Sequence, residues 1–180
     1  MFSRPWDPLS AAKAQDARTS AELLRLGLPE PGEYVTDIRF YLQRMTDRGR
    51  TLNGARLVAI QDAGNGTSLI EAGPTVFKEP CEQCILFRSG AKLSFGVTLR
   101  SDTRRSTMLA YRFHLQLLPA SGLKFVRIDL NTASDVRNGL DQPRSHIHPG
   151  FEGIHIPFPL MSPLEVLDRI FRVIEPYFSR

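Results

Sequence analysis

The chain has 180 residues, enough for a single domain, and its 42% hydrophobic and 23% charged residues are ordinary for a globular protein. It contains no run of about 18 uncharged apolar residues, which excludes a membrane-spanning helix. The net charge of +4 rests mostly on arginine, because only four lysines are present, and it permits a polyanionic partner without requiring one.

The first 52 residues are predicted to be a mainly helical segment. One helix is expected over about residues 10–26, where Thr19 and Glu22 have the spacing of a capping box. A second is expected over about residues 35–47, because apolar residues recur there at three- and four-residue steps. The start of the chain lacks the continuous apolar core of a signal peptide, so we expect a cytoplasmic protein.

From residue 56 onward the hydrophobic pattern changes to the two-residue period of β-strands. Turn residues such as Asn65 with Gly66 and Ser121 with Gly122 separate the predicted strands. The candidate strands cover residues 56–61, 67–72, 84–88, 92–100, 107–118 and 124–130. A terminal helix is predicted from Ser162, which precedes a proline and has the spacing of a capping box with Glu165.

These elements predict an α+β protein. A twisted, mostly antiparallel sheet of about five or six strands should pack against two N-terminal helices and one C-terminal helix. We therefore divide the chain into a helical segment, residues 1–52, and a sheet domain with the terminal helix, residues 53–180. The two parts are expected to form one compact unit.

Three of the four histidines lie between residues 146 and 155, after a polar stretch that is predicted to be a long loop. His146 and His148 are separated by one residue, so in an extended segment they project from one face with Cβ atoms about 6–7 Å apart. His155 follows across flexible glycine positions. The fourth histidine, His114, alternates with apolar residues and is expected on the polar face of a strand without a chemical role.

The leading hypothesis is metal-independent phosphoryl transfer on RNA, with no cofactor. Near neutral pH histidine populates both protonation states, so one imidazole could accept the 2′-hydroxyl proton while another protonates the leaving 5′-oxygen. The catalytic candidates are His146, His148 and His155. The candidates for phosphate and substrate binding are Arg144, Arg127, Arg112 and Tyr111.

Two metal hypotheses compete with this one. In the first, His146, His148 and Glu152 form a two-histidine, one-carboxylate site for a divalent metal. Their spacing resembles the first metal motif of the cupins. In the second, the same histidine pair shares zinc with Cys81 and Cys84, which have the spacing of a zinc knuckle. The other interpretation of the cysteines is a pair of reduced thiols, the default in the cytosol.

A non-catalytic binding module is the remaining class. Its arginine-rich surface would engage nucleic acid or a protein partner, and this binding would weaken steeply with salt and survive loss of the histidines. The residues of that surface are Arg100, Arg104, Arg105 and Arg112.

The C-terminal third, about residues 108–175, resembles the TumE-type toxins of prokaryotic toxin–antitoxin pairs. The resemblance rests on a Tyr-Arg-Phe-His-Leu-Gln strand from Tyr111, a hairpin return with Arg127-Ile-Asp129, the histidine group and the terminal helix. It implies a small α+β protein that acts on RNA and is held by a cognate antitoxin. The N-terminal helices would then serve partner binding or homo-oligomer formation.

Overall fold

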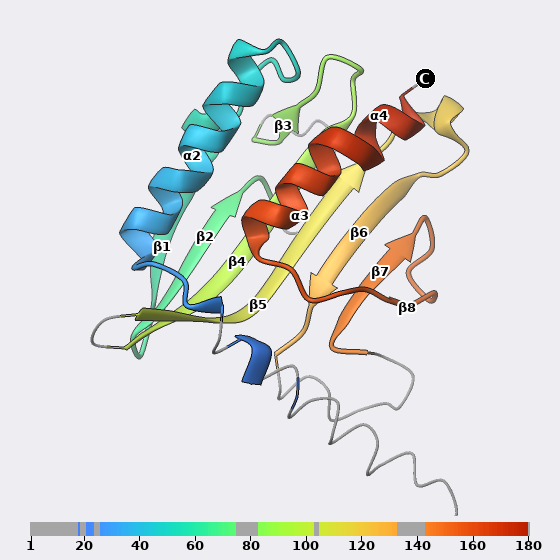
Figure 1. Cartoon of the computed structure of the whole chain (residues 1–180). Helices are drawn as coiled ribbons and strands as arrows, with labels where there is room; N and C mark the ends of the chain where they lie inside the picture. The colour runs from blue at the N-terminus through green and yellow to red at the C-terminus, as the bar shows by residue number, and fades with distance from the viewer. Residues whose placement is uncertain are drawn as a thin grey trace, which may run out of the picture.

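The computed structural model describes residues 18, 21–23, 26–74, 83–102, 105–132 and 143–179. Within these ranges the chain folds as an α+β protein, with an antiparallel sheet covered by helices on one face (Figure 1). The described part of the sheet holds eight strands in the order β1-β2-β4-β5-β6-β7-β8, with β3 paired to β4. The predicted fold class is confirmed, whereas the predicted count of five or six strands is too low.

The strands run almost sequentially across the sheet, and each neighbouring pair is antiparallel. They are β1 (Ala59–Gly64), β2 (Thr67–Ala72), β3 (Ile85–Leu86), β4 (Lys92–Asp102), β5 (Arg105–Gln116), β6 (Phe125–Leu130), β7 (Ser145–Pro149) and β8 (Ile156–Pro157). The prediction did not count β7 and β8 as strands. Both are short and contain proline, so neither shows an apolar alternation.

The helices lie side by side on one face of the sheet (Figure 1). α2 (Pro31–Asp47) starts four residues before the predicted helix, and a second helical stretch consists of α3 (Pro163–Arg169), a π-helical turn η4 (Ile170–Ile174) and α4 (Glu175–Phe178). Short 3-10 turns are η1 (Ala55–Leu57) and η2 (Pro119–Ser121). Of the predicted helix 10–26, only residues 18, 21–23 and 26 are described, and they are helical.

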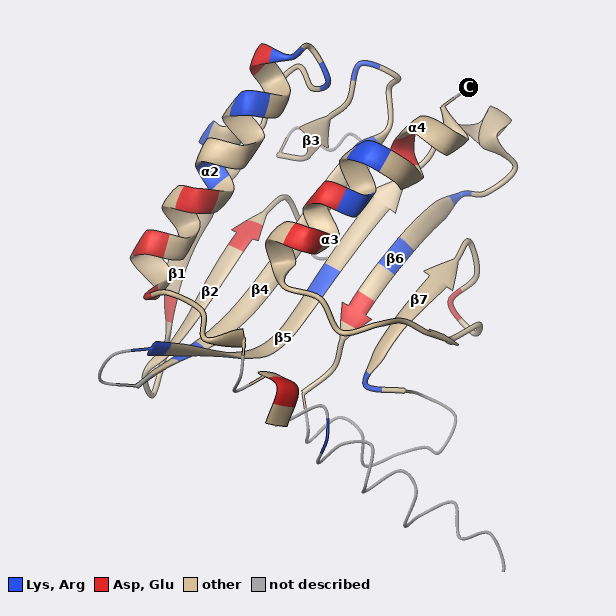
Figure 2. Cartoon of the chain, viewed as in Figure 1, with Lys and Arg blue, Asp and Glu red and all other residues tan. Residues whose placement is uncertain are grey.

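The helices of the described ranges are too short and too polar to cross a membrane. Acidic and basic side chains are intermixed along α2 and the C-terminal helical stretch rather than segregated by sign (Figure 2). The outer surface of this layer is therefore an ordinary solvated surface rather than a basic one.

The core fills the space between the helices and the sheet. On β4 the inward residues Leu93, Phe95, Val97 and Leu99 are at most 4% exposed. The ring of Phe171, from the C-terminal helical stretch, packs against the strand layer and α2 together. Its centroid is 4.7 Å from that of Phe87 and 5.8 Å from that of Tyr41. One hydrophobic cluster thus joins α2, the sheet and the terminal helix.

The start of the terminal helix confirms the predicted cap. The Ser162 hydroxyl accepts a hydrogen bond from the Glu165 backbone N–H, and the Glu165 carboxylate accepts one from the Ser162 backbone N–H. Further along, Pro176 has no N–H and its ring crowds the preceding turn, which accounts for the π-helical turn before α4. Arg50 Nη2 donates a 2.8 Å hydrogen bond to the carbonyl of Phe171 in that turn.

Cys84 is buried and disulfide-bonded. The prediction of a reduced thiol is therefore wrong at this residue. Because a zinc site needs the thiolate form of cysteine, the disulfide also removes Cys84 from the proposed cysteine–histidine zinc site. Cys81 lies outside the described residues.

Candidate functional site

Two rows of polar side chains cross β5, β6 and β7 on the sheet face opposite the helices. Directly paired residues of antiparallel strands point to the same face, so the strand register defines which side chains are neighbours. The Asp129 row contains Arg112, Asp129 and His146, and the Arg127 row contains His114, Arg127 and His148.

The histidine trio, His146, His148 and His155, gathers at the β7 end of these rows. Ile147 pairs with Ile156 of β8, and continuing this register by one residue places His155 opposite His148. Ring centroids are separated by 4.8 Å for His146 and His148, 4.9 Å for His146 and His155, and 4.3 Å for His148 and His155.

The trio is a sheltered cluster with one accessible side. One ring nitrogen from each residue lies within 4.8 Å of the other two. His146 and His148 are 2% and 0% exposed, whereas His155 is only partly buried. The three imidazoles therefore converge at one point of the sheet face.

Asp129 anchors the buried charges next to the trio. Its Oδ2 atom accepts a 2.7 Å bond from Nε of Arg127, and its Oδ1 atom lies 3.3 Å from Nε of Arg112. The same Oδ2 lies 3.3 Å from Nε2 of His148 and 3.7 Å from Nε2 of His146. A carboxylate that is 2% exposed needs such partners, so Asp129 fixes the relative positions of both rows.

Hydrogen bonds indicate which histidine nitrogens carry protons. His146 Nδ1 lies 2.6 Å from the carbonyl of Pro143, which only accepts, so Nδ1 is protonated and Nε2 presents a lone pair. His148 Nε2 lies 2.7 Å from Nη2 of Arg127, which only donates, so Nε2 accepts. Nδ1 of His148 is buried and has no hydrogen-bond partner among the described residues.

Burial keeps His146 and His148 neutral. Desolvation lowers the pKa of His146 below its ordinary value, and desolvation followed by the nearby Arg127 lowers the pKa of His148. Both rings are therefore uncharged at neutral pH. His114, further along the Arg127 row, has its pKa lowered to about 4, again mainly by burial.

Glu152 does not join the histidines. It comes from the loop between β7 and β8, its side chain is 62% exposed, and it pairs with Nη1 of Arg127. Among the described residues the metal-ligand group consists of the three histidines alone. The structure thus brings His155, rather than Glu152, to the predicted His146 and His148 pair.

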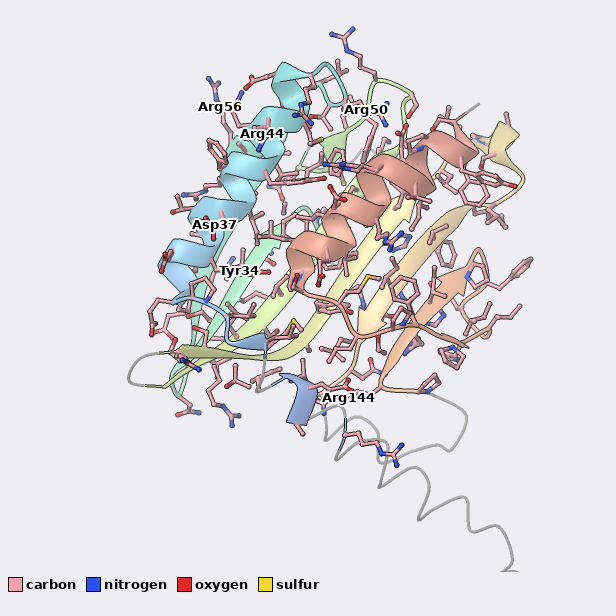
Figure 3. All side chains as sticks on the ribbon, in the orientation of Figure 1. Tyr34, Asp37, Arg44, Arg50, Arg56 and Arg144 are labelled. Carbon is pink, nitrogen blue, oxygen red and sulfur yellow. The ribbon has the colours of Figure 1, made fainter. Side chains whose placement is uncertain are left out.

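Tyr111 and Arg144 lie apart from the trio. Tyr111 belongs to the helix-facing layer, is 3% exposed and contacts the ring of Phe113 at 5.5 Å. Burial raises the pKa of its phenol to about 12. Arg144 precedes β7, is 6% exposed and donates through Nε to the carbonyl of Asn131 at 3.0 Å (Figure 3). Arg127 and Arg112 are the predicted binding residues that the structure brings to the histidine face.

The proposed arginine surface is described in part. Arg100 and Arg105 are exposed near the ends of β4 and β5, and Arg112 belongs to the Asp129 row. Arg104 lies outside the described residues. The function of these residues as a binding module stays a prediction.

No protein-family model matches the chain, and no curated protein and no solved structure matches it either. The resemblance to TumE-type toxins therefore stays a prediction. The functional argument rests on the geometry of the histidine face.

Proposed function

We propose that this protein is a divalent-metal enzyme whose metal is held by His146, His148 and His155. The observation that carries the proposal is the convergence of three imidazole nitrogens within 4.8 Å of one another beside a buried carboxylate. Three histidines with an open fourth position form a known ligand set of catalytic zinc. His155 is only partly buried, so solvent reaches one member of the trio.

The hydrogen bonds around the trio support this assignment. A metal-binding imidazole donates its second ring N–H to a carbonyl or carboxylate, which fixes the tautomer and orients the ring. His146 makes this bond to the Pro143 carbonyl and keeps Nε2 for a metal. Its neutral state also suits a ligand, because metal and proton compete for the same lone pair.

His148 offers a second free nitrogen. Its Nδ1 has no partner within the described ranges, so a cation there would displace the ring proton without breaking a hydrogen bond at Nδ1 itself. The ring proton would then reside on Nε2, 3.3 Å from Asp129 Oδ2, which can accept it. In that state Arg127 gives up its 2.7 Å contact with His148 and keeps Asp129 and Glu152 as partners.

The compactness of the trio favours a metal over acid–base catalysis by two histidines. An acid and a base on opposite sides of one phosphate must each reach an oxygen at about 2.6–3.2 Å, so their nitrogens stand more than about 6 Å apart. Here the rings pack edge to face with centroids 4.3–4.9 Å apart, in direct contact. The RNA nuclease, its antitoxin partner, homo-oligomer formation and a cytoplasmic location stay predictions.

The reaction class we assign is metal-assisted hydrolysis. A metal at the trio would lower the pKa of a bound water and polarise the carbonyl or phosphoryl oxygen of a substrate. The chain itself orients the ligands through Pro143 and Asp129. Arg112, whose side chain is 46% exposed, lies on the same face and is placed to hold an anionic substrate group.

Metal analysis of the untagged protein tests the proposal. We expect about one zinc or similar divalent ion per chain after dialysis against metal-loaded buffer, and its loss in His146→Ala, His148→Ala and His155→Ala. His114→Ala is the matched control, because this histidine shares the face but lies outside the trio. A wild-type protein that retains no divalent metal, or a control that loses metal as the trio variants do, would refute the proposal.

A further inference from the structure

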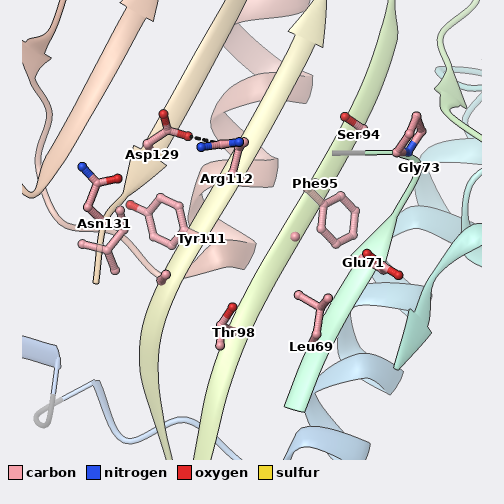
Figure 4. Close-up of a pocket in the computed structure, with 14 residues that line it drawn as sticks. Leu69, Glu71, Gly73, Ser94, Phe95, Thr98, Tyr111, Arg112, Asp129 and Asn131 are labelled. Carbon is pink, nitrogen blue, oxygen red and sulfur yellow. Dashed lines mark hydrogen bonds and ion pairs between the residues drawn. The ribbon is translucent and has the colours of Figure 1, made fainter. Parts of the chain in front are cut away.

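A hollow of about 220 Å³ is lined by residues of β2, β4, β5 and β6, among them Asp129 (Figure 4). The strand register puts Asp129 and His146 on the same face of the sheet. The register places Gly96 of β4 between Glu71 of β2 and Arg112 of β5, so this glycine forms the floor. A Cβ added at Gly96 would meet one described atom within 4 Å, Cδ1 of Leu69 at 3.7 Å. The absence of a side chain at residue 96 therefore keeps the hollow open.

The two sides of the hollow carry opposite charges. Glu71 and Arg112 lie one strand to either side of Gly96, which places their backbones about 9–10 Å apart. Arg112 is tied to Asp129 through Nε and keeps 46% of its side chain exposed. Glu71 is partly exposed and accepts a hydrogen bond from Gln61. An anionic ligand alone would be repelled by Glu71, and a cationic one alone by Arg112.

The remaining lining is mixed. Leu69 and Ala110 contribute apolar surface, and Ser94 and Thr98 contribute hydroxyl groups. Convergent polar groups on an otherwise apolar wall are typical of small-molecule sites. The distance of about 9–10 Å between the backbones of Glu71 and Arg112 corresponds to about two or three extended residues of peptide.

The lining of the hollow includes Asp129, which lies beside the proposed metal centre. Glu71, Gly96, Arg112, Asp129 and His146 occupy successive paired positions on β2, β4, β5, β6 and β7. A molecule seated over Gly96 would therefore touch Arg112, which contacts the same Asp129 that lies beside the trio.

We propose that this hollow binds a small zwitterion of dipeptide size, with its carboxylate at Arg112 and its ammonium group at Glu71. Binding itself does not need a metal. Its role as the subsite for the non-reacting part of a substrate rests on the proposed function. The floor glycine sets the depth of the site, and the two charges set its polarity.

Calorimetric titration of the full chain with alanyl-leucine tests this proposal. N-acetylalanyl-leucine lacks the ammonium charge and alanyl-leucinamide lacks the carboxylate, so each should bind at least about tenfold more weakly than the zwitterion. Gly96→Val should abolish binding by filling the hollow, and it should fold normally because valine favours strands. Gly32→Val is the matched control, since its Cβ would have no described neighbour within 4 Å.

Equal binding of the capped and free peptides, no binding of alanyl-leucine at millimolar concentration, or unchanged binding in Gly96→Val would overturn the proposal. The titration is repeated with metal-free protein and with His146→Ala. Dipeptide binding should survive in both, because it does not need a metal. If untagged wild-type protein retains no metal after dialysis against metal-loaded buffer but still binds alanyl-leucine, the metal centre is refuted and the hollow stands. Wild-type protein that retains its metal but does not bind alanyl-leucine would refute the hollow as a binding site and leave the metal centre standing.

Discussion

Replacing Asp129 with asparagine tests the electrostatics that hold the two polar rows together. Asparagine keeps the shape of the side chain and removes a negative charge from a residue that is 2% exposed. Arg127, whose side chain is 14% exposed, would lose its 2.7 Å charge-assisted bond. Arg112 is 3.3 Å away with a side chain that is 46% exposed, so solvent screens its pairing and little stability is lost there.

The expected destabilisation follows from the buried partner. Removing one member of a buried ion pair costs about 3–5 kcal/mol, because the other charge is left without compensation. Arg127 keeps its contact with Glu152, which is exposed, so we expect the lower end of this range, about 3 kcal/mol. Loss of the Asp129 carboxylate should also weaken metal binding about 10–100-fold, as for other residues that orient ligands.

Urea unfolding followed by circular dichroism measures the change as a shift of the midpoint at constant slope. Asp168→Asn is the matched control. Its carboxylate lies 2.6 Å from Nε of Arg172, but the two side chains are 39% and 65% exposed, so the loss should stay below about 1 kcal/mol. If Asp129→Asn costs no more than this control, the reasoning about the buried carboxylate is wrong.

Three further predictions use the same unfolding assay. Burial lowers the pKa of His114 from 6.5 to about 4, so stability should fall as pH drops from 6.5 to 4, and His114→Gln should remove that loss, at most about 3 kcal/mol. An unchanged pH profile in the variant would contradict this. Ser162→Ala deletes the capping box and should cost about 1 kcal/mol, whereas no change would show that Glu165 caps the helix alone. Gly73→Ala should cost about 1–3 kcal/mol, because φ is +82° and the new Cβ would lie 2.9 Å from Cβ of Ser94; neutrality would mean that the strand end relaxes freely.

Local sequence signals located most of the fold. The alternation on β4 and the proline-led cap at Ser162 are properties of neighbouring residues, so sequence alone placed these elements within a few residues. The sequence did not predict β7 and β8 because both are short, contain proline and lack an apolar alternation. Cys84 was predicted to be a thiol because cytosolic cysteines are reduced by default, and its disulfide contradicts that assumption.

The sequence predicted the histidines of the site but not the buried carboxylate beside them. The one-residue spacing placed His146 and His148 on one face, as observed, but His155 reached them through the β8 register rather than by sequence proximity. The sequence pattern placed Asp129 on the return strand of a hairpin but did not predict a role for it at the site. Its position two residues after Arg127 could have indicated that both side chains lie on the same polar face of the strand. Its burial was not predictable, because it depends on the pairing of Asp129 with His146 of β7.

X-ray absorption at the zinc K-edge on untagged, zinc-loaded protein is the most direct test of the histidine trio. The account predicts one zinc per chain with three imidazole nitrogens at about 2.0–2.1 Å and one oxygen ligand from water. His155→Ala should bind too little zinc to give that spectrum, and His114→Ala should leave it unchanged. A spectrum without multiple imidazole ligands, or one that His155→Ala does not alter, would contradict the central claim.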